Sequence, residues 1–121
     1  MADFKDCIPI ITVRDVKRAT RFYVDVLGFR LDFEVGAPHF VTGLFKDAVQ
    51  VMLIGSDGVN VRQQPGTANL NFFVDEVDGL FSLCRDAAVE VIVPPGDRDY
   101  GQRDFAIRDP DGNVLVFGCA A

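Results

Sequence analysis

The sequence contains no tryptophan, one histidine and three cysteines. Three cysteines without a CxxC pair do not make a disulfide framework, so we expect small buried thiols in a reducing, cytoplasmic protein. No apolar run is long enough to span a bilayer, and the N-terminal residues lack the pattern of a signal peptide, which argues against a membrane protein. The single histidine, His39, rules out a metal centre built on several histidines.

Basic residues are also scarce, since 12 Lys and Arg stand against 18 Asp and Glu and give a net charge of −6. This balance argues against a protein that follows nucleic-acid phosphates. It is compatible with plain solubility or with attraction of a cationic ligand, and composition does not choose between them. The aromatic residues are 11 Phe and two Tyr. Most of these rings are expected in the core, and a few in loops could stack on a flat ligand.

A strand followed by a helix occurs twice, at a spacing of 61 residues that places Val13 on Val74 and Val16 on Val77. The first copy predicts a strand at 7–13 and a helix at 17–26, and the second a strand at 68–74 and a helix at 78–87. Further strands are predicted at 30–35, 39–46, 49–54, 89–93, 103–108 and 113–118. A proline-containing loop is predicted at 94–101 and a tight turn at 109–113.

This pattern predicts an α+β fold in a single domain, residues 1–121, with an internal repeat of two tandem βαβββ modules at 7–57 and 66–119. A pseudo-twofold pair of such modules is expected to form a curved mixed sheet around a cleft, with the helices on its outer side. Asp15 is predicted to cap the first helix and Gly28 to end it.

Two motifs, one near each end of the chain, resemble the vicinal oxygen chelate superfamily, which includes glyoxalases, bleomycin resistance proteins and extradiol dioxygenases. The first motif is Pro9-x-x-x-Val13-x-Asp15-Val16-x-x-Ala19-x-x-Phe22-Tyr23-x-x-x-Leu27-Gly28-Phe29. The second is Phe105-x-x-x-Asp109-Pro110-Asp111-Gly112-Asn113. The resemblance covers nearly the whole chain and implies the superfamily's fold, on which many different chemistries occur.

The resemblance also implies four positions where enzymes of this superfamily hold a divalent metal through His, Glu or Gln. In this chain those positions carry Ile8, Met52, Asn69 and Val116. Asn69 alone could donate an amide oxygen, and one weak donor does not make a metal site. We therefore expect no metal, no other cofactor and no catalytic residue, although the sequence leaves the question of enzyme activity open.

The pattern is most similar to the metal-free bleomycin resistance proteins, which sequester a flat cationic antibiotic in clefts at a dimer interface. The resemblance implies a homodimer, a stacking role for Tyr100, and a hinge at Pro9 from which an N-terminal arm can reach a partner subunit. We predict a protein that binds and sequesters an aromatic or cationic small molecule. The alternatives are a glyoxalase-like lyase, isomerase or dioxygenase with a non-standard metal site, and a structural partner whose cleft is filled.

Strand alternation indicates which side chains face the cleft, because every second residue points to the same face. The predicted ligand-binding residues are Phe33, His39, Phe40, Gln50, Met52, Asn69, Asn71, Phe73, Tyr100, Asp104 and Val116. The opposite face, carrying residues such as Ile11, Val51, Phe72 and Phe117, is expected to lie under the helices.

Overall fold

The computed structural model describes residues 1–36, 40–58 and 61–121. Its elements are β1 (Ile10–Val13), α1 (Val16–Asp25), β2 (Arg30–Val35), β3 (Val41–Lys46), β4 (Val49–Gly55), β5 (Asn69–Phe73), α2 (Asp78–Asp86), β6 (Val91–Asp97), β7 (Gln102–Arg108) and β8 (Val114–Ala120). They form two four-stranded sheets with the orders β1-β4-β3-β2 and β5-β8-β7-β6, in which β1–β4 and β5–β8 are parallel. The α+β class and the two βαβββ modules are confirmed.

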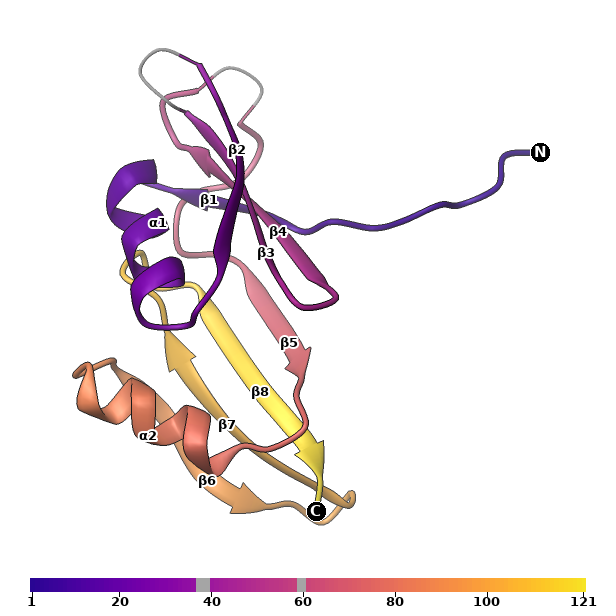
Figure 1. The fold of residues 1–121 in the computed structure, drawn as a ribbon, viewed down its shortest axis with the longest axis vertical. Coiled ribbons are helices and arrows are strands. Elements are labelled where there is room, and N and C mark those ends of the chain that lie inside the picture. The colour runs from indigo at the N-terminus through magenta and orange to yellow at the C-terminus, as the bar shows by residue number, and fades with distance from the viewer. Residues whose placement is uncertain (37–39, 59–60) are drawn as a thin grey trace.

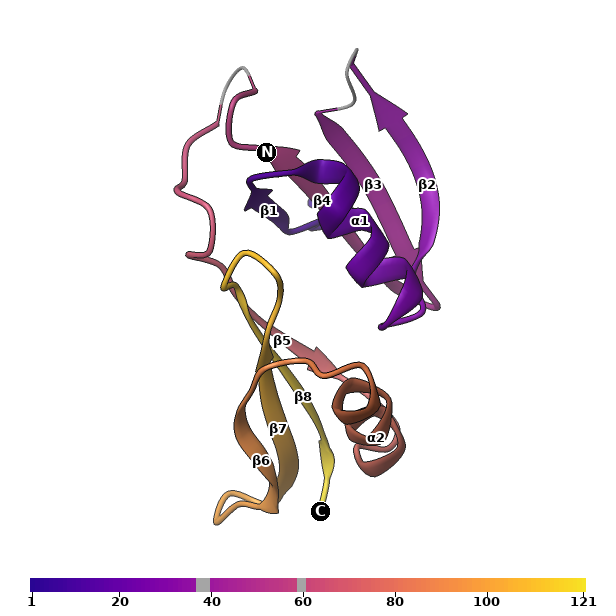
Figure 2. The same cartoon turned by 90° about the vertical axis from the view of Figure 1, so that its left-hand side faces the viewer.

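The two modules lie end to end, with both helices on the same side of the molecule (Figures 1 and 2). The N-terminal segment before β1 extends away from the other side (Figure 1). We call the sheet face under a helix the helix face and the other the open face. The helix faces carry the core, which includes Ile11, Val51, Leu53, Phe72 and Phe117, so the predicted alternation of faces is correct for these residues.

Local sequence signals set the ends of the first helix. The side chain of Asp15 accepts a hydrogen bond from the backbone N–H of Arg18 at 3.2 Å, as expected of an N-cap. Gly28 follows the helix with φ of 81°, a left-handed conformation that glycine adopts without steric cost. Both predictions at these positions are confirmed.

The turn between β7 and β8 contacts the first module through hydrogen bonds. Both oxygens of Asp109 are occupied: Oδ1 accepts from the backbone N–H groups of Asp111 and Asn113, and Oδ2 accepts from Asn113 Nδ2 and from the hydroxyl of Tyr23. Tyr23 lies on α1 of the other module, and its hydroxyl is 2.7 Å from the carboxylate. Asp111 also accepts from the backbone N–H of Arg14 at 2.8 Å. These hydrogen bonds fix the β7–β8 turn of the second module against the first module.

The structure corrects the predicted boundaries at two strands and the burial of two cysteines. β1 begins at Ile10 and not at residue 7. Cys7 is exposed in the N-terminal segment and Cys119 is partly buried, whereas Cys84 is fully buried. β6 continues through Pro94 and Pro95, which were predicted to lie in a loop. Prolines are tolerated there because β6 is an edge strand whose pairing with β7 shifts register around them.

Candidate functional site

The open face of the first sheet is apolar. Ile10, Met52 and Gly43 lie side by side across β1, β4 and β3. The ring of Phe33 on β2 covers Gly43 so closely that a Cβ at that position would collide with it. Phe33 is 40% exposed and Ile10 is 54% exposed, so this surface is open to solvent in the single chain.

The open face of the second sheet has a polar centre at Asp104 of β7. This carboxylate accepts from Arg98 Nε at 2.7 Å and from the hydroxyl of Tyr100 at 2.9 Å. Arg98 also donates to the backbone carbonyls of Pro94 and Asp104, so its guanidinium is fixed in place. The negative charge of Asp104 is therefore compensated, and Asp104 is poorly suited to act as a general base.

Aromatic side chains flank this polar centre. Phe73, Gly118 and Asp104 lie in one row across β5, β8 and β7, and Phe73 is 73% exposed. Tyr100 is 70% exposed while its hydroxyl stays bonded to Asp104, and this hydrogen bond raises the pKa of the phenol. Tyr100 therefore stays protonated at neutral pH and presents an aromatic surface and not a base.

The structure divides the predicted binding residues between the two open faces. Asn71, Phe73, Asp104 and Val116 occupy neighbouring rows of the second sheet, and Tyr100 reaches them from the β6–β7 connection. Asn69 lies at the start of β5, opposite Val114.

The remaining predicted residues belong to the first module. Phe33 and Met52 share the first open face, and Gln50 is an exposed residue of the same strand as Met52. Phe40 packs against Gly36 at the end of β2. His39 lies outside the described residues.

Arg98 is the main member of this surface that sequence reasoning missed. It lies in a stretch that was predicted as a loop, so no face could be assigned to it. Its partner Asp104 lies on the next strand, beyond the turn at 98–101, so the period of a single strand does not relate the two residues. In the observed register, Ile10 pairs with Met52 and Asn71 pairs with Val116, whereas Ile8 precedes β1.

The residues at the superfamily's metal positions do not fit a divalent ion. Ile8 and Val116 carry hydrocarbon side chains, Met52 a thioether, and Asn69 a neutral amide. The alternatives brought close by the observed register, Ile10 and Asn71, add one hydrocarbon and one amide. Across residues 1–36, 40–58 and 61–121, no group of three His, Cys, Asp or Glu side chains is placed to hold a metal ion.

The buried hydroxyl of Tyr23 has a structural role. Burial raises the pKa of the Tyr23 hydroxyl far above its usual value, and the neighbouring Asp109 carboxylate raises it further. Burial also raises the pKa of the Cys84 thiol to about 11, so this cysteine is not a nucleophile at neutral pH.

In the described part of the chain, no helix is long and apolar enough to cross a membrane.

A profile of the Glyoxalase/Bleomycin resistance protein/Dioxygenase superfamily matches residues 7–117. The chain therefore belongs to this superfamily, as its two motifs predicted. It is 28% identical to a bleomycin resistance protein of Geobacillus stearothermophilus, over 91% of this chain and 92% of that protein. It is also 28% identical to a virulence protein of Salmonella typhimurium, over 88% of this chain and 77% of that protein.

Solved structures show the same architecture. The bleomycin-binding protein of Streptomyces verticillus, determined with copper(II)-bleomycin, superposes with a TM-score of 0.74 at 27% identity, over 100% of this chain and 99% of that one. TioX of Micromonospora sp. ML1 superposes with a TM-score of 0.83 at 22% identity, over 97% of this chain and 100% of that one, which shows likeness of fold alone.

Proposed function

We propose that the protein is a homodimer that binds and sequesters an aromatic or cationic small molecule, without chemical change, between the open faces of two copies. The first sheet of one copy would supply the apolar wall with Phe33 and Met52. The second sheet of the other copy would supply Phe73, Tyr100 and the compensated Asp104. The observation that carries this proposal is the exposed aromatic pair around a fixed polar centre, the combination typical of small-molecule sites.

A second copy is needed because the open faces are exposed in the single chain. Large apolar side chains on or beside them are exposed: Ile10, Phe33, Val35, Phe73, Val93 and Tyr100. Exposed apolar side chains gathered on one face of a sheet typically mark an association site. β1 and β5 are also edge strands of their sheets, so their outer backbone groups are available for a partner. Isologous pairing would form two equivalent clefts.

Binding without catalysis is supported by the state of the polar groups. Both oxygens of Asp104 accept hydrogen bonds from Arg98 or Tyr100, and the raised pKa keeps the Tyr100 phenol neutral. Amide groups at Asn69 and Asn71 would then orient a ligand by hydrogen bonds. The likeness to a bleomycin-binding protein at 27% identity supports an antibiotic-like ligand.

Calorimetric titration with copper(II)-bleomycin tests the proposal. We expect saturable binding with one site per chain, and about tenfold weaker binding for Tyr100→Ala because a stacking surface is lost. Arg85→Ala, an exposed change on α2, is the matched control and should bind like the wild type. Sedimentation should show a dimer, and Ile10→Asp should both dissociate it and abolish binding. A monomer that still binds, or equal binding by Tyr100→Ala, would contradict this arrangement.

A further inference from the structure

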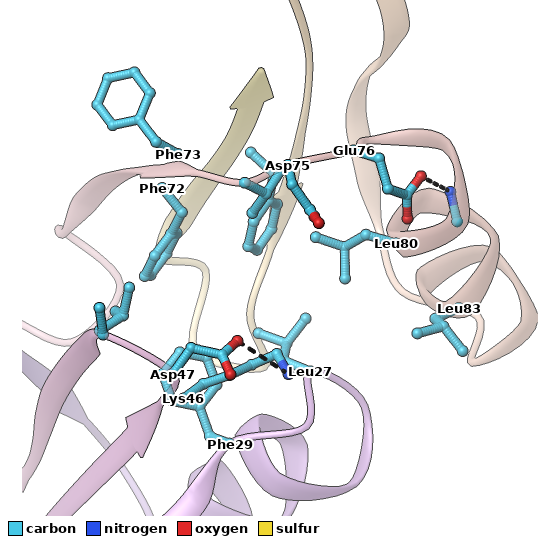
Figure 3. Close-up of a pocket in the computed structure, with 15 residues that line it drawn as sticks. Leu27, Phe29, Lys46, Asp47, Phe72, Phe73, Asp75, Glu76, Leu80 and Leu83 are labelled. Carbon is cyan, nitrogen blue, oxygen red and sulfur yellow. Dashed lines mark hydrogen bonds and ion pairs between the residues drawn. The ribbon is translucent and has the colours of Figure 1, made fainter. Parts of the chain in front are cut away.

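A cavity, separate from the open faces, lies between the two modules on their helix side. Its volume is about 620 Å³. One wall is the β3–β4 hairpin at 46–49, and the other is the β5–α2 connection at 74–76 with the exposed side of α2 (Figure 3). Leu27, Phe29, Phe72 and Phe117 form its floor. We call this cavity the intermodule groove.

The floor of the intermodule groove is rigid and apolar. Its four residues are between 4% and 8% exposed, so they are held by the core beneath. Phe29 makes an edge-to-face contact with Phe72 at 6.3 Å between ring centroids, and Phe72 stacks on Phe117 at 5.2 Å. Leu83, on the α2 wall, is 58% exposed and adds apolar surface above this floor. An apolar ligand would therefore enter a preformed site and would not have to open one.

The rim of the groove is acidic. Asp47, Asp75 and Glu76 border it, against one basic residue, Lys46. Lys46 Nζ is 3.9 Å from the carboxylate of Asp47, and Glu76 accepts a hydrogen bond from the backbone N–H of Gly79 (Figure 3). Asp75 has no hydrogen-bond or ion-pair partner among the described residues, and its carboxylate points into the groove (Figure 3).

We propose that the intermodule groove binds a hydrophobic cation, with its apolar body over Phe29 and Phe72 and its positive group beside Asp75. The apolar floor favours burial of the body, and the unpaired carboxylate selects the sign of the charge. This site is independent of the open faces. Phe73 borders both regions, but its ring points away from the groove (Figure 3).

The test uses two probes with the same ring system and opposite charge, 9-aminoacridine, which is a cation at neutral pH, and acridine-9-carboxylate. Fluorescence titration of the full chain should show saturable binding of the cation and much weaker binding of the anion. Asp75→Asn should weaken the cation about fivefold, the effect expected of one partly exposed ion pair. Leu83→Arg should abolish binding in the groove because it places a bulky cation there.

Both variants replace exposed side chains, and circular dichroism should show that each retains the fold. Asp25→Asn, which neutralises an exposed carboxylate of α1 outside the groove, is the matched control and should leave acridine binding unchanged. The proposal is overturned if the two probes bind equally, if neither binds, or if Tyr100→Ala weakens the cation while Leu83→Arg does not. The last outcome would place the bound cation on the open face.

Discussion

The two modules share a strand order but use equivalent positions differently. The β3–β4 turn of the first module is tight and exposed, with Asp47 in a left-handed conformation at φ of 52°. The equivalent β7–β8 turn of the second module is longer, and its residues Asp109, Asp111 and Asn113 are buried. The second turn hydrogen-bonds to the neighbouring module through Tyr23 and Arg14.

The open faces of the two modules also differ in chemistry. The first places an aromatic ring over a glycine and is apolar at its centre, whereas the second places a charge-compensated carboxylate between two aromatic side chains. In the proposed dimer, the apolar face of one copy would lie against the polar and aromatic face of the other. A duplicated scaffold can therefore form an asymmetric cleft, one wall for burial and one for orientation.

The contrast between the two turns predicts the largest effect on stability. Asp109→Ala removes the acceptor of four hydrogen bonds and leaves buried donors unpaired, so the free energy of unfolding should fall by about 3 kcal/mol or more. Asp47→Asn is the matched change in the exposed turn, and it should stay within about 0.5 kcal/mol because Asn tolerates left-handed geometry and exposed ion pairs contribute little. Urea unfolding measures both. Similar losses for the two variants would contradict the assignment of the module contact to the second turn.

The Tyr23 hydroxyl predicts a smaller, pH-dependent effect. Tyr23→Phe should lower the free energy of unfolding by about 1–2 kcal/mol at neutral pH, because Asp109 loses a buried donor. The pKa of Tyr23 is raised in the folded protein, so the folded state keeps the phenolic proton after the unfolded chain has lost it. Its contribution is therefore complete below the unfolded pKa of about 10 and decreases as the pH rises above that value.

The wild type should consequently lose about 1.4 kcal/mol per pH unit above pH 10 relative to Tyr23→Phe. Urea unfolding between pH 7 and pH 11 measures this difference, in which the titration of other groups cancels. Parallel pH profiles of the two proteins would show that the hydroxyl is not buried against Asp109.

Sequence reasoning succeeded where the signal is local. Asp15 and Gly28 set the ends of α1 through their own chemistry, and Gly112 adopts φ of 96° in the predicted turn. It failed where the answer depends on parts distant in sequence or irregular in backbone. The hydrogen bond from Arg98 to Asp104 depends on the backbone path of β6, whose bulges around Pro94 and Pro95 follow no regular period.

The intermodule groove was not predicted for a related reason. Its floor combines Phe29 of one module with Phe72 and Phe117 of the other, and alternation only indicated that such residues lie under the helices. How closely the two helix faces approach, and whether a space remains above the rings, depends on packing between modules. A repeat in the sequence defines the modules but not the distance between them.

The smallest predicted effect separates the two open faces through their glycines. Gly43→Ala should displace the ring of Phe33 from its position over residue 43. The free energy of unfolding should fall by about 1 kcal/mol, because the ring is half exposed and can move. Gly118→Ala meets its nearest neighbours at 3.4–3.5 Å, ordinary contact distances, and should change the free energy of unfolding by less than about 0.5 kcal/mol. In a double-mutant cycle, Phe33→Ala should remove most of the cost of Gly43→Ala, because the collision is then absent. Additive losses would mean that Phe33 does not cover Gly43, and the first open face would then lack its aromatic wall.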